Sequence, residues 1–245
     1  HSIKFGASAI NHTFRPGAFT LDHNSVLGVD DLYNADSLIA VNNTINSQEY
    51  GIYLEDNLTF SSKLKGNIGF HSTLINVQKT QYFSFQPRIS LFYELNNSTY
   101  LKGSIGKMMQ NLHLLTTSGI GLPTDLWVPA TSKVKPQEAW QGTLGIERKL
   151  PKNLSLTLEG YYKKMNNLIT YQEGSSFLVE SLVLDASNWE TKVTSGKGKS
   201  YGVELSLKKN IGKLKGWANY TFSRSKRVFT EINFGEAYNF RFDRP

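Results

Sequence analysis

Apolar and polar residues alternate over 13 positions between Phe83 and Leu95, and only Phe92 interrupts the polar set. Successive side chains of a β-strand point to opposite faces, so this segment predicts one apolar face and one polar face. Strands of globular proteins average about 5–6 residues. A strand that crosses a bilayer needs about 9–11 residues. The segment therefore predicts a strand long enough to cross a membrane.

The same period of two recurs along the whole chain. The alternating segments are residues 3–9, 50–60, 64–74, 83–95, 101–107, 140–146, 154–162, 201–207 and 214–222. Residues 50–60 are less regular because Asp56 falls on the apolar side, and residues 101–107 give the weakest pattern. The pattern predicts an all-β chain with about nine antiparallel strands.

The connections between these segments fall into two classes. Short turns are predicted at 61–63, 96–98, 151–153 and 209–212, and long loops at 13–48, 107–136 and 165–199. The two classes alternate from the second strand onward, with the brief link at 76–80 as the exception on the long side. Membrane barrels of the bacterial outer membrane have short periplasmic turns and longer extracellular loops. The sorting of connections therefore favours such a barrel.

The polar side of the alternation carries charges. Arg88, Glu147, Glu159 and Glu204 all fall on it, and these side chains are costly in lipid but suit the lumen of a barrel. Tyrosine and tryptophan near strand ends fit the aromatic girdles of a membrane interface. A β-sandwich with one solvated face is the alternative, but long strands and sorted loops favour the barrel.

An odd number of strands, about nine, does not suit a complete single-chain barrel, which usually has an even number. Alone they would leave two unpaired edges, which lipid does not tolerate. Both chain ends look cut, so the sequence predicts a segment of a longer protein that forms part of a large transmembrane barrel. No apolar run approaches the roughly 18 residues that a transmembrane helix needs.

The chain is basic, with a net charge of +7. Lysine and arginine are scattered along the sequence rather than gathered in one patch, so the charge does not predict a nucleic-acid partner. A solvated surface is one interpretation. The functional interpretation is a cationic rim that faces anionic lipid or lipopolysaccharide.

The residues that most enzymes and metal proteins need are missing or badly spaced. There is no cysteine, and the five histidines lack metal-ligand spacing. No nucleophile motif with credible partners is present. The sequence therefore predicts no catalytic residue, no metal site and no cofactor.

Any ligand-binding residues should lie in the loops, where binding residues concentrate. The candidates are aromatic and basic loop residues: Arg15, Tyr33, Trp127, Tyr171 and Trp189. Local packing within the loops is the alternative role for each of them. An apolar pocket with a few polar groups is the general expectation for a small ligand.

Several longer motifs resemble TonB-dependent outer-membrane receptors. They are 112–115 with 119–129 (LHLL and GIGLPTDLWVP), 160–169 (GYYKKMNNLI), 196–205 (GKGKSYGVEL), and the end of the chain from 220 to 245. The subgroup that they resemble carries a small carboxypeptidase-regulatory-like domain ahead of a plug. The resemblance covers nearly the whole chain and makes residues 1–245 a partial barrel domain.

This resemblance implies a multi-pass protein of the bacterial outer membrane, with about 22 strands when complete and a plug in its lumen. It implies import of a scarce nutrient with energy delivered through TonB, and no enzymatic activity. TonB would act through the plug region, which this sequence lacks together with a TonB box. Two alternatives stay open: a non-transporting adhesion or binding barrel, and a soluble β-sandwich lectin.

Overall fold

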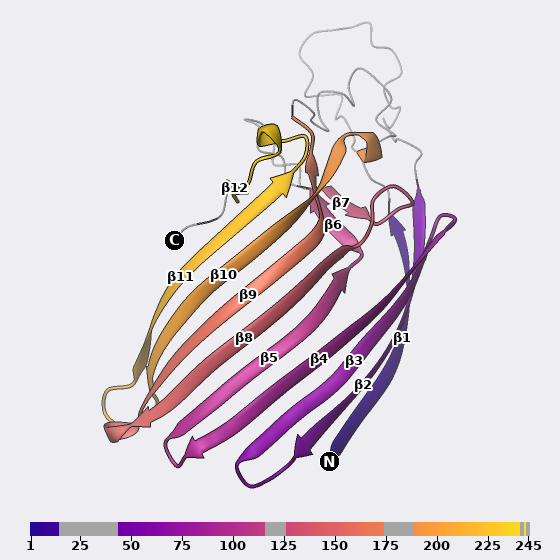
Figure 1. Ribbon diagram of the computed structural model, residues 1–245. Helices are drawn as coiled ribbons and strands as arrows, with labels where there is room; N and C mark the ends of the chain where they lie inside the picture. The colour runs from indigo at the N-terminus through magenta and orange to yellow at the C-terminus, as the bar shows by residue number, and fades with distance from the viewer. Residues whose placement is uncertain (15–43, 116–125, 174–188, 241–242, 244–245) are drawn as a thin grey trace, which may run out of the picture.

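Figure 1 shows the chain as one curved wall of long strands that lie side by side. The computed structural model describes residues 1–14, 44–115, 126–173, 189–240 and 243. Within them, ten strands form a single antiparallel sheet in the order β1-β2-β3-β4-β5-β8-β9-β10-β11-β12. Apart from β6 and β7, each strand pairs with its neighbours along the chain, as in an up-and-down barrel. The all-β class and the antiparallel order predicted from the sequence are confirmed.

Nine of the ten strands are 12–18 residues long, and β12 has two residues. Their bounds are β1 Ser2–Phe14, β2 Ile45–Thr59, β3 Leu64–Val77, β4 Thr80–Asn96, β5 Thr99–Gln110, β8 Gln137–Leu150, β9 Leu154–Tyr171, β10 Val193–Lys209, β11 Gly216–Phe229 and β12 Tyr238–Asn239. A separate hairpin joins β6, Leu112–Leu115, to β7, Leu126–Pro129. Three short 3-10 turns are η2 Pro151–Asn153, η3 Trp189–Thr191 and η4 Asn233–Gly235.

The turns at the lower end of Figure 1 are short for local reasons. Ser61 accepts backbone hydrogen bonds from Lys63 and Leu64 at 3.2 and 3.0 Å. Asn96 accepts one from the Ser98 amide at 3.1 Å. Asx and Ser/Thr turns of this kind close a hairpin in few residues. The opposite end of the sheet carries the long connections, as the sequence predicts, except for the tight link from β3 to β4.

All three predicted long loops are shorter than the sequence suggested. The one at 13–48 loses only a few residues at each end, to β1 and β2. The predicted loop at 165–199 is wrong at both ends, because β9 continues to Tyr171 and β10 begins at Val193. The predicted loop at 107–136 contains the end of β5 and the β6–β7 hairpin. In the predicted loop at 165–199, the apolar alternation stops, but the backbone pairing of β9 with β10 continues. This pairing has a register shift between Gly196 and Gly198. The alternation of apolar and polar residues indicates which residues face lipid. It does not indicate where the backbone hydrogen bonds between two strands end.

The two faces of the sheet differ as the sequence predicts. On one face the large apolar side chains stay exposed, among them Phe83 at 71% and Leu144 at 72%. The other face carries charged residues such as Lys102 and Glu147, which form an ion pair. No second sheet covers the apolar face among the described residues, which argues against a β-sandwich. Exposed apolar residues over so long a wall match a surface that lipid covers.

The described residues bury side chains in two clusters, both at the end with the long connections. One contains Ile45, Ile75 and Val77, with Phe14, Tyr82 and Met109 packed against it. The other is built around the β6–β7 hairpin and is described below. None of the described helical segments is long and apolar enough to cross a membrane.

Candidate binding surface at the long-connection end

The end of β5 and the connection from β5 to β8 contact the polar face of β4. Strands β4 and β5 are paired only from Asn96 up to Arg88, so the rest of β4 has no strand partner on that side among the described residues. The Met109 amide, near the end of β5, donates to Gln86 Oε1 at 3.1 Å, and the Tyr82 hydroxyl donates to the carbonyl of Thr131 in the connection at 2.6 Å. The connection is therefore held against the side chains of β4.

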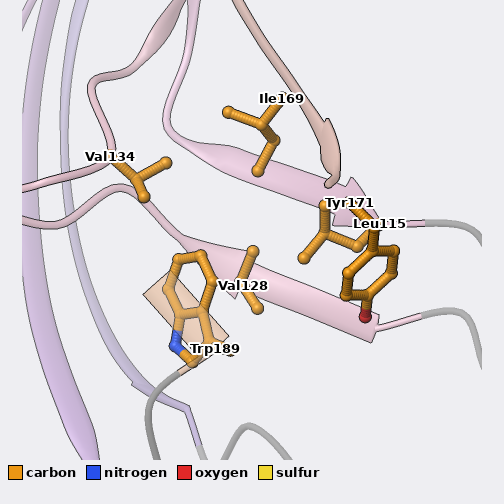
Figure 2. Packing of buried hydrophobic residues seen from close by; sticks show 6 residues of the cluster. All are labelled: Leu115, Val128, Val134, Ile169, Tyr171 and Trp189. Carbon is orange, nitrogen blue, oxygen red and sulfur yellow. The ribbon is translucent and has the colours of Figure 1, made fainter. Parts of the chain in front are cut away.

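The hairpin of β6 and β7 has a buried face. Leu115 and Val128 of this face pack with Val134 of the same connection, with Ile169 and Tyr171 at the end of β9, and with Trp189 in the connection from β9 to β10 (Figure 2). Trp189, in η3, is only 1% exposed and is the largest fully buried side chain. The cluster thus joins two connections that are far apart in the sequence into one supported surface.

The other face of the hairpin is open. Leu114 and Trp127 lie directly opposite each other in the β6–β7 register, and both are exposed, Trp127 at 51%. Directly opposed residues on one face of a strand pair have their Cβ atoms about 5 Å apart. The pair therefore forms an apolar platform on a backbone that the buried cluster holds in place.

His113 lies on the buried face of the hairpin and is 0% exposed. The side-chain amide of Gln137 lies 2.9 Å from its Nδ1, and Nε2 has no partner among the described residues. Burial lowers the pKa of His113 to about 4, against the opposing effect of a hydrogen bond with the backbone of Lys135. The structure thus places this histidine in the support of the platform.

The lowered pKa makes the hairpin sensitive to acid. The folded hairpin holds neutral His113, so its stability is complete above pH 6.5 and is lost progressively as the pH falls from 6.5 to about 4. We expect a loss on the order of 2 kcal/mol of local stability at pH 5. Limited proteolysis of this connection at pH 7 and pH 5 measures it. The variant His113→Gln should remove the difference between the two pH values, and equal pH dependence in both proteins would contradict this role.

The structure describes three of the five predicted loop candidates and gives them different surroundings. Trp127 is exposed on the platform, whereas Tyr171 is buried at the end of β9, and Trp189 is buried beside it. The alternative role, local packing, therefore fits Tyr171 and Trp189. Arg15 and Tyr33 lie outside the described residues. Sequence reasoning missed Leu114, because its place beside Trp127 depends on a strand pairing that no local pattern reveals.

The four polar residues predicted to face the lumen all lie on the polar face by register. Glu159 lies opposite Glu204 across β9 and β10, and neither forms an ion pair with a described residue. Glu147 pairs with Lys102. Arg88 has glycine opposite it on both neighbouring strands, Gly69 and Gly106.

A shallow hollow surrounds Arg88 on this face, lined in part by Tyr53, Glu55 and His71. A Cβ atom at Gly69 would lie 2.7 Å from the Leu54 carbonyl oxygen and 2.8 Å from Glu55 Cβ. At position 69, therefore, only glycine fits without a shift of the backbone. No group of three or more metal-binding side chains occurs in the part of the chain that the structure describes.

The sequence was compared with known families and proteins. The family described as "TonB dependent receptor-like, beta-barrel" matches residues 3–243. The chain belongs to this family of TonB-dependent receptors. A search of curated proteins gives no match. The match covers almost the whole sequence, so the resemblance to TonB-dependent receptors is confirmed, and the resemblance to one subgroup stays a prediction.

Solved receptor structures share the fold. The FrpB iron transporter from Neisseria meningitidis, F3-3 variant, aligns with a TM-score of 0.57 at 12% identity, over 93% of this chain and 33% of that one. The siderophore receptor PirA from Acinetobacter baumannii aligns with a TM-score of 0.54 at 16% identity, over 97% and 35%. The ferripyoverdine receptor of the outer membrane of Pseudomonas aeruginosa, bound to ferripyoverdine, aligns with a TM-score of 0.52 at 15% identity, over 80% and 24%.

This TonB-dependent receptor chain thus spans about a quarter to a third of the length of the structures it matches. The family places it in the bacterial outer membrane as part of a β-barrel, and its relatives are transport receptors rather than enzymes. Short turns of such barrels face the periplasm and long connections face the exterior. The Leu114–Trp127 platform therefore lies at the extracellular end of the barrel wall.

Proposed function

We propose that this chain forms part of the barrel wall and of the extracellular surface of a receptor. This receptor imports a scarce nutrient across the outer membrane with energy delivered through TonB. The observation that carries the proposal is the polar face, which continues from β1 to β10 opposite the lipid-facing one. Its charges include the pairs Lys4–Glu55, at 3.3 Å, and Lys102–Glu147. A face of this kind suits an aqueous or plugged lumen rather than lipid.

The TonB partner follows from the family and would act through a plug outside this sequence. The hollow at Arg88 lies on the face that such a plug would meet. Glu159 and Glu204 belong to the same lumen wall, where their carboxylates can stay hydrated. We assign these residues to the wall of the transport path rather than to a catalytic role.

The ligand would first meet the exposed platform. Leu114 and Trp127 offer apolar contact area on a rigid hairpin, and Trp residues dominate many binding surfaces because they bury a large area. The iron transporter, the siderophore receptor and the ferripyoverdine receptor with the same fold make an iron chelate the first ligand class to examine. Arg15 and Tyr33 remain candidates for polar contacts from the first long connection.

We expect Trp127→Ala to weaken ligand binding by about tenfold or more in the complete receptor. The measurement is binding of candidate iron chelates to whole cells. Trp217→Ala is the matched control, because Trp217 is also exposed, at 73%, but lies beside the short turn between β10 and β11. Equal affinities for the Trp127 variant and the parent would exclude the platform as the contact surface.

Transport itself is tested separately, by uptake in strains that lack either the receptor gene or TonB. Both deletions should abolish uptake of the nutrient at limiting concentration. Binding that persists without TonB, combined with loss of uptake, would agree with energy-dependent import. Uptake or growth unchanged in both strains would instead favour a non-transporting adhesion barrel.

A further inference from the structure

Three lysines from three adjacent strands lie in one row. Lys199 of β10 is directly opposite Lys164 of β9 and directly opposite Lys226 of β11. Neighbouring strands are about 4.8 Å apart, so the three Cα atoms span about 10 Å. The sequence separates these lysines widely and predicted a scattered charge, and the strand register brings them together.

The row lies on the lipid-facing side of the sheet. In β10, Lys199 continues the alternating set of Tyr201 and Val203. In β9, Lys164 continues the alternating set that contains Tyr162. Tyr162 and Tyr201 are both exposed and are directly opposite each other, one step closer to the short turns. Trp140 of β8 lies opposite Lys164 in the same row as the lysines.

These aromatic residues mark the depth of the lysines in the membrane. Tyrosine and tryptophan side chains gather where the apolar band meets the headgroups. The lysines lie at that boundary, on the side of the long connections, and their flexible stems can extend the ammonium groups further outward. The row therefore lies at the headgroups of the extracellular leaflet.

Among the described residues, none supplies a counter-charge to the row. Like charges directly opposite each other destabilise a strand pair. No carboxylate of the described residues forms an ion pair with Lys164, Lys199 or Lys226, whereas Lys107, further along the same row, pairs with Glu138 at 3.4 Å. An anion from outside the chain would remove the repulsion among the three lysines.

We propose that Lys164, Lys199 and Lys226 bind the phosphate groups of a phosphorylated glycolipid, lipopolysaccharide, in the outer leaflet. Lysine binds phosphate as a compact point charge, and three in a row match a lipid that carries several negative groups. Lys197, one step further from the apolar band, is exposed and extends the cationic surface. This assignment depends on the position of the barrel in the membrane and not on what the receptor transports.

The test uses the complete receptor in detergent micelles, titrated with lipopolysaccharide and followed by native mass spectrometry. In the variant Lys164→Gln, Lys199→Gln, Lys226→Gln we expect the apparent affinity to fall on the order of 100-fold. The control variant Lys65→Gln, Lys163→Gln, Lys208→Gln removes the same charge from the lumen-facing side and should bind as the parent does. Heat-modifiable mobility on a gel checks that both variants remain folded.

Retained affinity in the lipid-facing variant, or an equal loss in the control, would overturn the proposal. Dephosphorylated lipid should bind the parent and the lipid-facing variant equally. Competition by inorganic phosphate at the same concentration as the lipid would point to a site for free ions and would also overturn it. If the triple variant does not fold, Lys199→Gln alone should lower the affinity about fivefold, because Lys199 is the middle of the row.

Discussion

Replacing Trp189 with alanine is expected to release the β6–β7 hairpin from the barrel wall. Trp189 is 1% exposed and packs with Val128, which is 0% exposed, and with Leu115. Removing a buried tryptophan costs about 3–5 kcal/mol through lost transfer energy and an unfilled cavity. Because the cluster joins two connections, the cost should appear as local opening at the extracellular end rather than as loss of the barrel.

Limited proteolysis of intact cells measures this opening, because the long connections face outward. We expect rapid cleavage between β5 and β8 in Trp189→Ala, while the membrane strands stay protected. Trp127→Ala is the matched control, since Trp127 lies on the same surface but is 51% exposed. It should be cleaved as slowly as the parent although it binds ligand less well. Similar cleavage of the two variants would show that the cluster does not support the platform.

A charge on the lipid-facing side should have the second large effect. Leu158 of β9 is 44% exposed and lies opposite Leu205 and Ile146 on the apolar face. An arginine near the middle of a membrane barrel costs about 2–4 kcal/mol when it faces lipid. We therefore expect Leu158→Arg to lower the amount of folded receptor in the outer membrane several-fold.

The neighbouring residue provides the control for this substitution. Thr157 is next to Leu158 in the chain but lies on the polar face, opposite Glu147 and Ser206. Thr157→Arg should leave the amount of heat-modifiable receptor near that of the parent, because the guanidinium would face the lumen beside a carboxylate. If both substitutions reduced the receptor equally, the assignment of the two faces would be wrong.

The alternation of residue types predicted much of the fold. Each of the nine predicted strands overlaps a strand of the structure, although 50–60 ends one residue after β2 and 214–222 begins two residues before β11. Arg88, Glu147, Glu159 and Glu204 fall on the face opposite the exposed apolar side chains. This was possible because the period of a strand is local, so each residue is assigned to a face by its neighbours in sequence. Errors arose where the pattern ended before the strand did, as in residues 165–171.

The functional surfaces could not be predicted from this local pattern alone. Trp127 and Trp189 look alike in the sequence, as aromatic residues in long connections, yet one is exposed and the other is buried. The difference depends on which segments pack together at the end of the sheet. The sequence made both tryptophans candidates for ligand binding. It could not show which of them contacts a ligand and which supports the hairpin.

Long antiparallel strands with one face for lipid and one for water could be predicted from residue periodicity, because periodicity relates near neighbours in the sequence. Which residues of different strands meet could be seen only in the folded chain. Lys164, Lys199 and Lys226 form one row, and Leu114 meets Trp127, through registers that turns, bulges and hydrogen-bond ladders set. Register relates residues far apart in sequence, which is why local alternation could not reveal these two surfaces.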